Sequence, residues 1–149
     1  MRKADRATVE GSILRDVLYG LVLQDSGWHT VRGNSVTSMM EFAPERRGHA
    51  IYLWHTTDNL ISGNHVDGAK DGIFVGFGLR NTIEDNVVTN VRYGIHYMYA
   101  DDNVFRRNIF RDNLAGAALM YSRRLVLEDN EFSHNSSAAS GYGLLMKDV

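Results

Sequence analysis

The sequence lacks cysteine altogether and has a single proline among its 149 residues. Without thiols the chain can form neither a disulfide framework nor a thiolate metal site, so a bound metal must use histidine, methionine, tyrosine or carboxylate ligands. An excess of positive charge is also missing, because the formal net charge is -2 at pH 7. A nucleic-acid-binding protein needs a basic face to neutralise phosphates, so we do not expect nucleic acid as a partner.

Long apolar runs are absent as well. No run approaches the roughly 18 apolar residues that a membrane-spanning helix requires. The opening residues, MRKADRATVEG, carry charge but no apolar segment of the kind found in secretory signal peptides. We therefore expect a chain that does not itself span a membrane and that contains no signal peptide.

Asparagine, in contrast, recurs at a fixed interval. Asn64, Asn86, Asn108 and Asn130 follow one another at spacings of 22 residues. A small residue stands fourteen positions before each of these asparagines, in the series Ala50, Gly72, Gly94 and Gly116. Gly20 stands at the same distance before Asn34. Such self-similarity at a fixed period is the mark of a repeat architecture.

Apolar residues keep the same frame. The positions one and three after the small residue read Ile51 and Leu53, Ile73 and Val75, Ile95 and Tyr97, Ala117 and Leu119. This alternation is typical of half-buried strands, and no helical periodicity accompanies it. An all-β parallel β-helix, a solenoid with coils of about 22 residues, is therefore predicted, with the asparagines stacked as an internal ladder.

The frame also predicts the organisation of the chain. We expect residues 1–149 to form a single domain of about six coils, incomplete at its C-terminal end. Two units are longer than the others, and their insertions lie at about residues 37–49 and 133–142. Loops that leave a solenoid on one side are where binding usually concentrates.

The outward-facing positions of one sheet carry unusual residues. They lie two and four after the small residue, and in successive coils they read Tyr52 and Trp54, Phe74 and Gly76, His96 and Met98, Ala118 and Met120. An exposed apolar face of this kind marks an interface or a ligand site. We predict a binding face of Tyr52, Trp54, His55, Phe74, Tyr99 and Tyr121.

Soft donors on this face suggest a metal. Met98 and Met120 stand one coil apart, and His96 shares a strand face with Met98, so we predict these three as metal ligands, with Gly76 leaving space beside Met98. Thioether and imidazole donors without thiolate suit Cu(I) better than zinc, calcium or magnesium. The alternative is ordinary packing of methionines and aromatics beneath the insertions.

Acidic residues receive structural interpretations. The columns Glu84, Arg106, Glu128 and Asp85, Arg107, Asp129 alternate in sign, which predicts exposed charge ladders between coils. Asp71 is interpreted as a turn residue, His49 as structural and His29 as a solvated coil position. Because the outward strand face carries no carboxylates, we do not expect an enzyme, although a polysaccharide lyase or hydrolase is the runner-up.

Several segments resemble one known family, NosD, periplasmic maturation proteins for the copper sites of nitrous oxide reductase. The segments are AIYLW (50–54), KDGIFV (70–75), GIHYMY (94–99), AALMYS (117–122) and GLLMKDV (143–149). The resemblance implies a right-handed parallel β-helix of the carbohydrate-binding and sugar-hydrolase (CASH) repeat type, working as a periplasmic binding protein in denitrification. It further implies as partners an ABC transporter with ATPase and membrane subunits, a lipoprotein copper chaperone and the reductase.

The sequence departs from the family pattern in length and in export. Members are normally longer and carry a signal peptide, whereas this chain stops at LLMKDV, part-way through a coil. We therefore expect a fragment or a short relative. The predicted function is a non-catalytic copper-handling and docking module; the alternative is a carbohydrate-binding or polysaccharide-cleaving β-helix with Tyr52 and Trp54 as sugar-stacking platforms.

Overall fold

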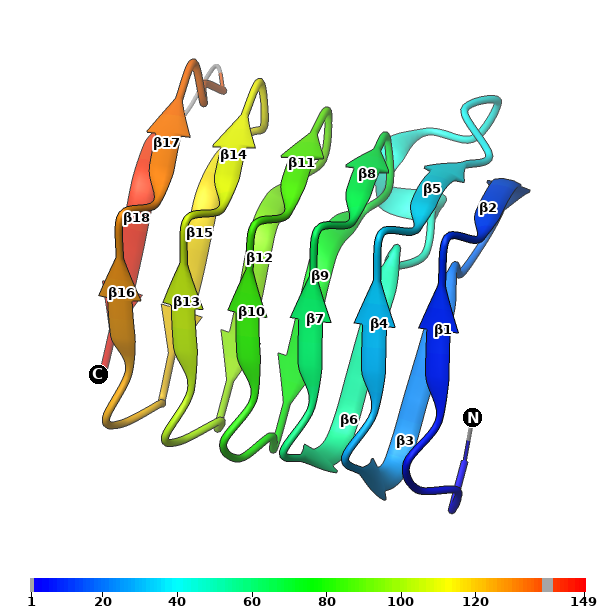
Figure 1. Ribbon diagram of the computed structural model, residues 1–149. Helices are drawn as coiled ribbons and strands as arrows, with labels where there is room; N and C mark the ends of the chain where they lie inside the picture. Colours follow the sequence, from blue (N-terminus) through cyan, green and yellow to red (C-terminus); the bar gives the residue numbers. More distant parts are fainter. Residues whose placement is uncertain (1, 138–140) are drawn as a thin grey trace.

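The computed structural model describes residues 2–137 and 141–149, and it is built almost entirely of short parallel strands. Within those residues, eighteen strands form three sheets of six strands each. Successive strands of the chain enter the three sheets in rotation, so that each coil adds one strand to every sheet. The molecule is a right-handed parallel β-helix, in which the first two sheets face the viewer and the third lies behind them (Figure 1).

The strands of each sheet lie one coil apart. The first sheet contains β1 (Thr8–Glu10), β4 (Thr30–Arg32), β7 (Leu60–Ser62), β10 (Thr82–Glu84), β13 (Val104–Arg106) and β16 (Val126–Glu128). The second contains β2 (Ile13–Val17), β5 (Ser35–Ser38), β8 (His65–Asp67), β11 (Val87–Thr89), β14 (Ile109–Arg111) and β17 (Glu131–Ser133). The third contains β3 (Leu21–Gly27), β6 (Ile51–Thr57), β9 (Asp71–Gly76), β12 (Tyr93–Met98), β15 (Ala115–Met120) and β18 (Tyr142–Lys147).

The core follows the alternation seen in the sequence. The residues predicted to point inward from the third sheet are at most 1% exposed: Ile51, Leu53, Ile73, Val75, Ile95, Tyr97, Ala117 and Leu119. The inward residues of the other two sheets pack against them in the same cluster. Burial of these stacked columns drives folding, because each coil covers the apolar edge of the next.

The predicted asparagine ladder is confirmed. In each step the side-chain amide of one asparagine donates to the Oδ1 of the next, from Asn34 through Asn64, Asn86 and Asn108 to Asn130, at N···O distances of 2.9 Å. The same Oδ1 atoms accept backbone N–H groups at this corner. The ladder therefore satisfies polar groups that the tight turn would otherwise bury without partners.

A second ladder, at the corner that precedes the first sheet, was not predicted. Asn59 donates to Asn81 and Asn81 donates to Asn103. His29 continues this column toward the N-terminal end, where its backbone N–H donates to Asn59 Oδ1 and its ring contacts Ser26 Oγ at 3.0 Å. The prediction that His29 is solvated is wrong, because it is 1% exposed and takes an asparagine position in this column.

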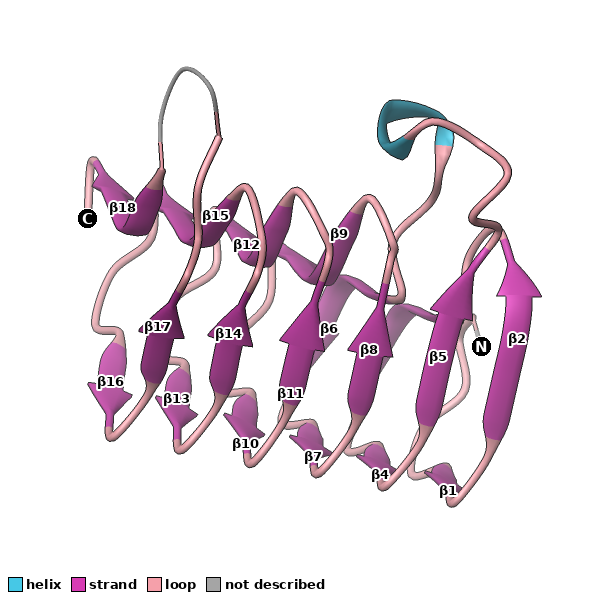
Figure 2. Ribbon diagram, turned by 90° about the horizontal axis from the view of Figure 1, so that it is seen from above, coloured by secondary structure: helices cyan, strands magenta, loops and turns pink. Residues whose placement is uncertain are grey.

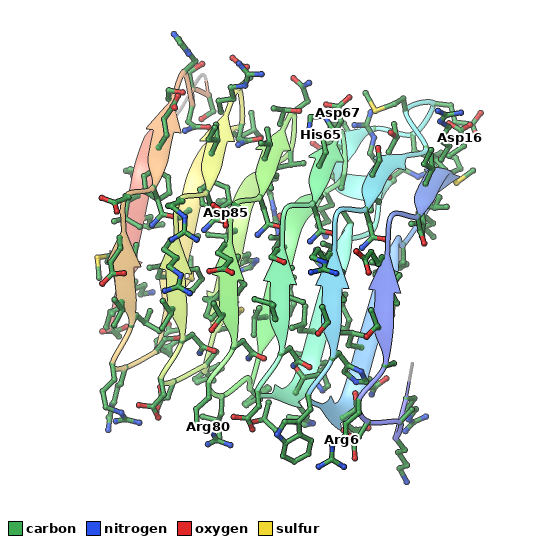
Figure 3. The ribbon with its side chains drawn as sticks, viewed as in Figure 1. Arg6, Asp16, His65, Asp67, Arg80 and Asp85 are labelled. Carbon is green, nitrogen blue, oxygen red and sulfur yellow. The ribbon has the colours of Figure 1, made fainter. Side chains whose placement is uncertain are left out.

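Charged side chains outside the coils form the first step of each predicted ladder, but among the described residues no ion pair joins Arg106 to Glu128 or Arg107 to Asp129. Arg106 Nε lies 2.6 Å from Glu84 Oε2, and Arg107 Nε lies 2.8 Å from Asp85 Oδ1. A further pair joins Arg80 to Asp58 at the edge of the solenoid, where Figure 3 shows the Arg80 side chain projecting outward. These carboxylates are engaged by arginines of the next coil, which supports their structural interpretation.

Both long connections leave the solenoid where the second and third sheets meet. The first joins β5 to β6 and contains one short 3-10 helix, η1 (Pro44–Arg46), which rises above the sheets in Figure 2. The second joins β17 to β18, and its residues 138–140 lie outside the described residues. Gly48 and Arg47 tie the first connection to the coils through hydrogen bonds with Leu18 and Gly68.

Candidate metal centre

The two predicted thioether ligands lie side by side on the outer surface of the third sheet. Met98 of β12 and Met120 of β15 are paired in register, and both are partly exposed. Neighbouring strands of a sheet lie about 4.8 Å apart, so the two side chains leave the sheet close together and in the same direction. His96 stands two residues before Met98, on the same face of β12.

Trp54 of β6 borders this pair. A Cβ atom added to Gly76 would lie 2.7 Å from the indole ring of Trp54, so the ring lies over Gly76. Gly76 is in turn paired with Met98. The prediction that Gly76 leaves open space beside Met98 is wrong, because the indole fills that space.

His96 leans toward the beginning of its strand, where it meets Asp71. Its Nδ1 atom lies 3.0 Å from Asp71 Oδ2, and its ring packs edge-to-face against Phe74 and Tyr93 with centroid distances of 5.0 Å. The side chain is 11% exposed. Since Nδ1 is engaged with Asp71, the distal nitrogen Nε2 is the atom left for a ligand.

Asp71 is a buried carboxylate at the centre of a polar cluster, so its interpretation as a simple turn residue is wrong. It is 0% exposed, and Arg92 donates to both of its oxygens at 2.8 and 2.7 Å. His49 Nδ1 also lies 3.3 Å from Asp71 Oδ2. Burial alone would raise the pKa of the Asp71 carboxyl, but the nearby His49 and the hydrogen-bonded His96 and Arg92 hold it well below its usual range.

The sequence contained one signal for this cluster. Asp71 and Arg92 stand 21 residues apart, one short of the repeat, so they fall on neighbouring coils. His49 was not detectable in this way, because it lies at the end of the first insertion and outside the frame.

The predicted aromatic face divides into a covered part and an exposed part. Taken as whole residues, Phe74 is 7% exposed, His96 9% and Ala118 0%. The prediction of a uniformly exposed face is therefore wrong at these three positions. The rings of Tyr52 and His49 stack against Phe74 with centroid distances of 5.2 and 4.8 Å. The first insertion supplies His49 and thereby contributes to this cover.

The exposed part lies at the corner that follows the third sheet. Phe77, Tyr99 and Tyr121 occupy one column and stack with centroid distances of 5.3 and 5.0 Å. His55 extends the column beside Phe77 at 5.0 Å, and Lys147 Nζ lies 5.6 Å from the Tyr121 ring. Phe77 was absent from the predicted binding face, although its position 22 residues before Tyr99 is visible in the repeat.

These ring geometries bear on the sugar-stacking alternative. A sugar packs on the free face of an aromatic ring, whereas Tyr52 is stacked on Phe74, Trp54 covers Gly76, and Tyr99 is stacked between Phe77 and Tyr121. One face of the Tyr52 ring and one face of the Trp54 ring are therefore taken by neighbours, which leaves less ring surface for a stacked sugar.

Comparison with known proteins identifies the family of the chain. The sequence model of a family described as "Periplasmic copper-binding protein (NosD)" matches residues 34–149. The chain belongs to the NosD family. No curated protein matches it in sequence. The matched region contains Asp71, His96, Met98 and Met120, and the family is periplasmic and copper-binding.

The donor atoms on this face fit the metal of the NosD family. Two partly exposed thioethers in register and a nearby imidazole are soft and borderline donors of the kind that Cu(I) prefers. Within residues 2–137 and 141–149, no three His, Asp or Glu side chains are arranged to hold a metal ion. Asp71, His49 and His96 do not form such a group, because Arg92 already occupies both carboxylate oxygens.

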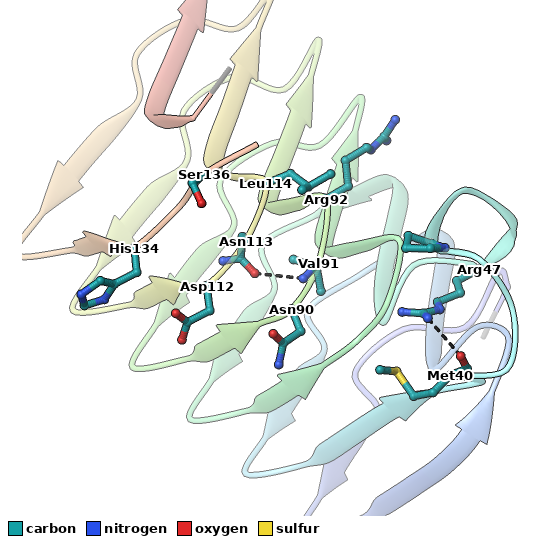
Figure 4. Close-up of a pocket in the computed structure, with 11 residues that line it drawn as sticks. Met40, Arg47, Asn90, Val91, Arg92, Asp112, Asn113, Leu114, His134 and Ser136 are labelled. Atoms are coloured by element: carbon teal, nitrogen blue, oxygen red, sulfur yellow. Dashed lines mark hydrogen bonds between the residues drawn. The ribbon is translucent and has the colours of Figure 1, made fainter. Parts of the chain in front are cut away.

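A groove of about 480 Å³ lies between the two insertions (Figure 4). Met40 and Arg47 border it on one side and His134 and Ser136 on the other. None of the predicted metal or binding residues lines it, and of its described lining residues Asp112 alone carries a carboxylate. Arg47 is fixed in this NosD-family structure by donating to the carbonyl oxygens of Met40, Phe42 and Gly68.

In the part of the chain that the structure covers, no helix is long and apolar enough to cross a bilayer.

Proposed function

We propose that this NosD-family protein is a non-catalytic copper-handling and docking protein in the maturation of the copper sites of nitrous oxide reductase. The observation that supports it most is the registered pair Met98 and Met120 on the outer face of the third sheet, with His96 on the same strand. In this proposal the three side chains bind Cu(I) as cargo.

The chemistry of the site suits transfer rather than storage. Thioethers are neutral, polarizable ligands that hold Cu(I) without needing deprotonation. Met98 and Met120 are partly exposed, so a partner can approach an ion held between them. A buried thiolate cage would restrict such exchange.

The partners in this proposal are those of the family. They are the ATPase and membrane subunits of an ABC transporter, a lipoprotein copper chaperone, and the reductase. The exposed corner supports a docking role, because Phe77 is 43% and Tyr99 48% exposed, and both lie on the coils that carry Gly76 and Met98. A partner seated there would lie beside the thioethers.

Replacing both thioethers is expected to weaken Cu(I) binding at least tenfold, which corresponds to about 1.4 kcal/mol. The double variant Met98→Leu/Met120→Leu keeps the side-chain volume and removes both sulfur atoms. The measurement is an anaerobic Cu(I) titration against a competing chelator, which gives both stoichiometry and affinity.

Met146→Leu is the matched control. Met146 also lies on the third sheet, but it is paired with the inward-facing Leu119 and not with Met120. The Met146→Leu variant is expected to bind one Cu(I) as the original protein does. Equal affinities for the original protein and the folded double variant would refute the proposed ligands.

A further inference from the structure

We propose that Asp71 is a positioning residue for copper binding, and that it fixes the proton of His96 on Nδ1 so that Nε2 is free to bind the metal. This inference rests on the proposed function for the role of His96 as a ligand. It concerns the buried cluster of Asp71, Arg92, His96 and His49, in which the sequence predicted a functional role for His96 alone.

The first step is the state of the carboxylate. Asp71 is fully buried, and the guanidinium of Arg92 donates to Oδ1 at 2.8 Å and to Oδ2 at 2.7 Å. A bidentate arginine pairs with an ionised carboxylate. An ionised carboxylate is an acceptor only.

The second step is the tautomer of His96. Its Nδ1 atom lies 3.0 Å from Asp71 Oδ2, an oxygen that carries no proton. The hydrogen between these atoms must therefore belong to Nδ1. In a neutral imidazole one nitrogen carries the proton and the other carries the lone pair, so the lone pair lies on Nε2.

The third step is the orientation of the ring. Phe74 and Tyr93 pack edge-to-face against His96, with both centroid distances at 5.0 Å. These contacts hold the imidazole plane while Asp71 holds its proton. A carboxylate that orients the second nitrogen of a metal-binding histidine also makes the ligand more basic.

His49 occupies a weaker place in the same cluster. Its Nδ1 atom lies 3.3 Å from Asp71 Oδ2, but it makes no aligned hydrogen bond with any described residue. Arg92 and His96 already approach this oxygen more closely. We therefore assign the positioning role to the pair of Asp71 and His96.

The position of the proton is measurable without copper. In the copper-free protein, long-range ¹H–¹⁵N spectra of the imidazoles distinguish a protonated from an unprotonated nitrogen, and the His96 signals are assigned by their loss in His96→Phe. We expect an Nδ1–H tautomer. An Nε2–H tautomer of His96 in the original protein would overturn the inference, and this result needs no other variant to fold.

The variant Asp71→Asn tests whether the Asp71 carboxylate sets the tautomer of His96. When Arg92 takes the amide oxygen, the NH₂ group faces His96 Nδ1 and should reverse the tautomer, as happens when a carboxylate beside a catalytic histidine becomes an amide. Cu(I) affinity should then fall by about tenfold or more, the usual range for loss of an outer-shell partner. An unchanged tautomer, or a reversed tautomer with unchanged affinity, would overturn the inference.

Asp67→Asn is the control for the loss of one negative charge. Asp67 is partly exposed at the end of β8, the strand that precedes Asp71 in the same coil, and it pairs with Thr89 and Asn90. This variant should leave both the tautomer and the affinity unchanged. The copper-free spectrum judges the positioning role alone, whereas the methionine variants judge the proposed function, so the two failures are distinguishable.

Discussion

Asn86→Ala is expected to lower the free energy of unfolding by about 3 kcal/mol or more, because each buried polar group left without a partner costs about 1–3 kcal/mol. Asn86 is 0% exposed, and its Nδ2 atom donates to Ile61 O, Glu84 O and Asn108 Oδ1. Its Oδ1 atom accepts from the backbone and side-chain nitrogens of Asn64. Truncation removes these hydrogen bonds from the middle of the ladder and leaves the buried backbone N–H of Asn64 without its Asn86 acceptor.

Asn90→Ala is the matched control for this measurement. Asn90 is an exposed asparagine of the same coil, and its side chain makes one hydrogen bond, to Asp67. Asn90→Ala should cost about 1–2 kcal/mol, because one exposed hydrogen bond is lost and alanine tolerates the positive φ of 55° less well than asparagine. Chemical denaturation of both variants gives the comparison, and an Asn86→Ala loss no larger than that of Asn90→Ala would contradict the internal ladder.

Gly94→Ala is expected to be similarly costly, at about 3 kcal/mol or more, because overpacking against rigid backbone is at the upper end of its usual range. A Cβ atom at Gly94 would overlap the carbonyl oxygen of Gly116 and lie 2.7 Å from Phe110 Cδ1. The carbonyl belongs to the next coil and cannot rotate away. The variant must therefore separate two coils or displace the core.

Gly143→Ala provides the control, because it occupies the same position in the last described coil. A Cβ atom there would meet Phe132 Cβ at 3.6 Å, an ordinary contact, and nothing closer among the described residues. Its unfolding free energy should change by less than about 1 kcal/mol, as for most surface substitutions. Equal losses in the two variants would show that coil packing does not explain the repeated glycine.

The fold was predictable because in a solenoid one spacing determines many contacts. The spacing of 22 residues between Asn86 and Asn108 places every residue between them beside its counterpart in the next coil. The same arithmetic correctly paired Met98 with Met120. The second ladder of Asn59, Asn81 and Asn103 obeys the same rule, but it is short and begins at a histidine, so it was overlooked.

The surroundings of the site were less predictable, because spacing does not determine where a side chain leans. His96 was expected to join Met98, yet its Nδ1 atom turns to Asp71, which lies near the beginning of the neighbouring strand. Trp54 leans across Gly76, where a glycine leaves room for it. The insertions break the frame, so the contribution of His49 was not available from the repeat.

The most direct test of the account is copper X-ray absorption on the Cu(I)-loaded protein. The account predicts sulfur and imidazole nitrogen in the first coordination shell, with the sulfur contribution lost in the folded Met98→Leu/Met120→Leu variant. A shell of nitrogen and oxygen alone, or a sulfur contribution that persists in that variant, would contradict the assignment of Met98 and Met120 as the copper ligands.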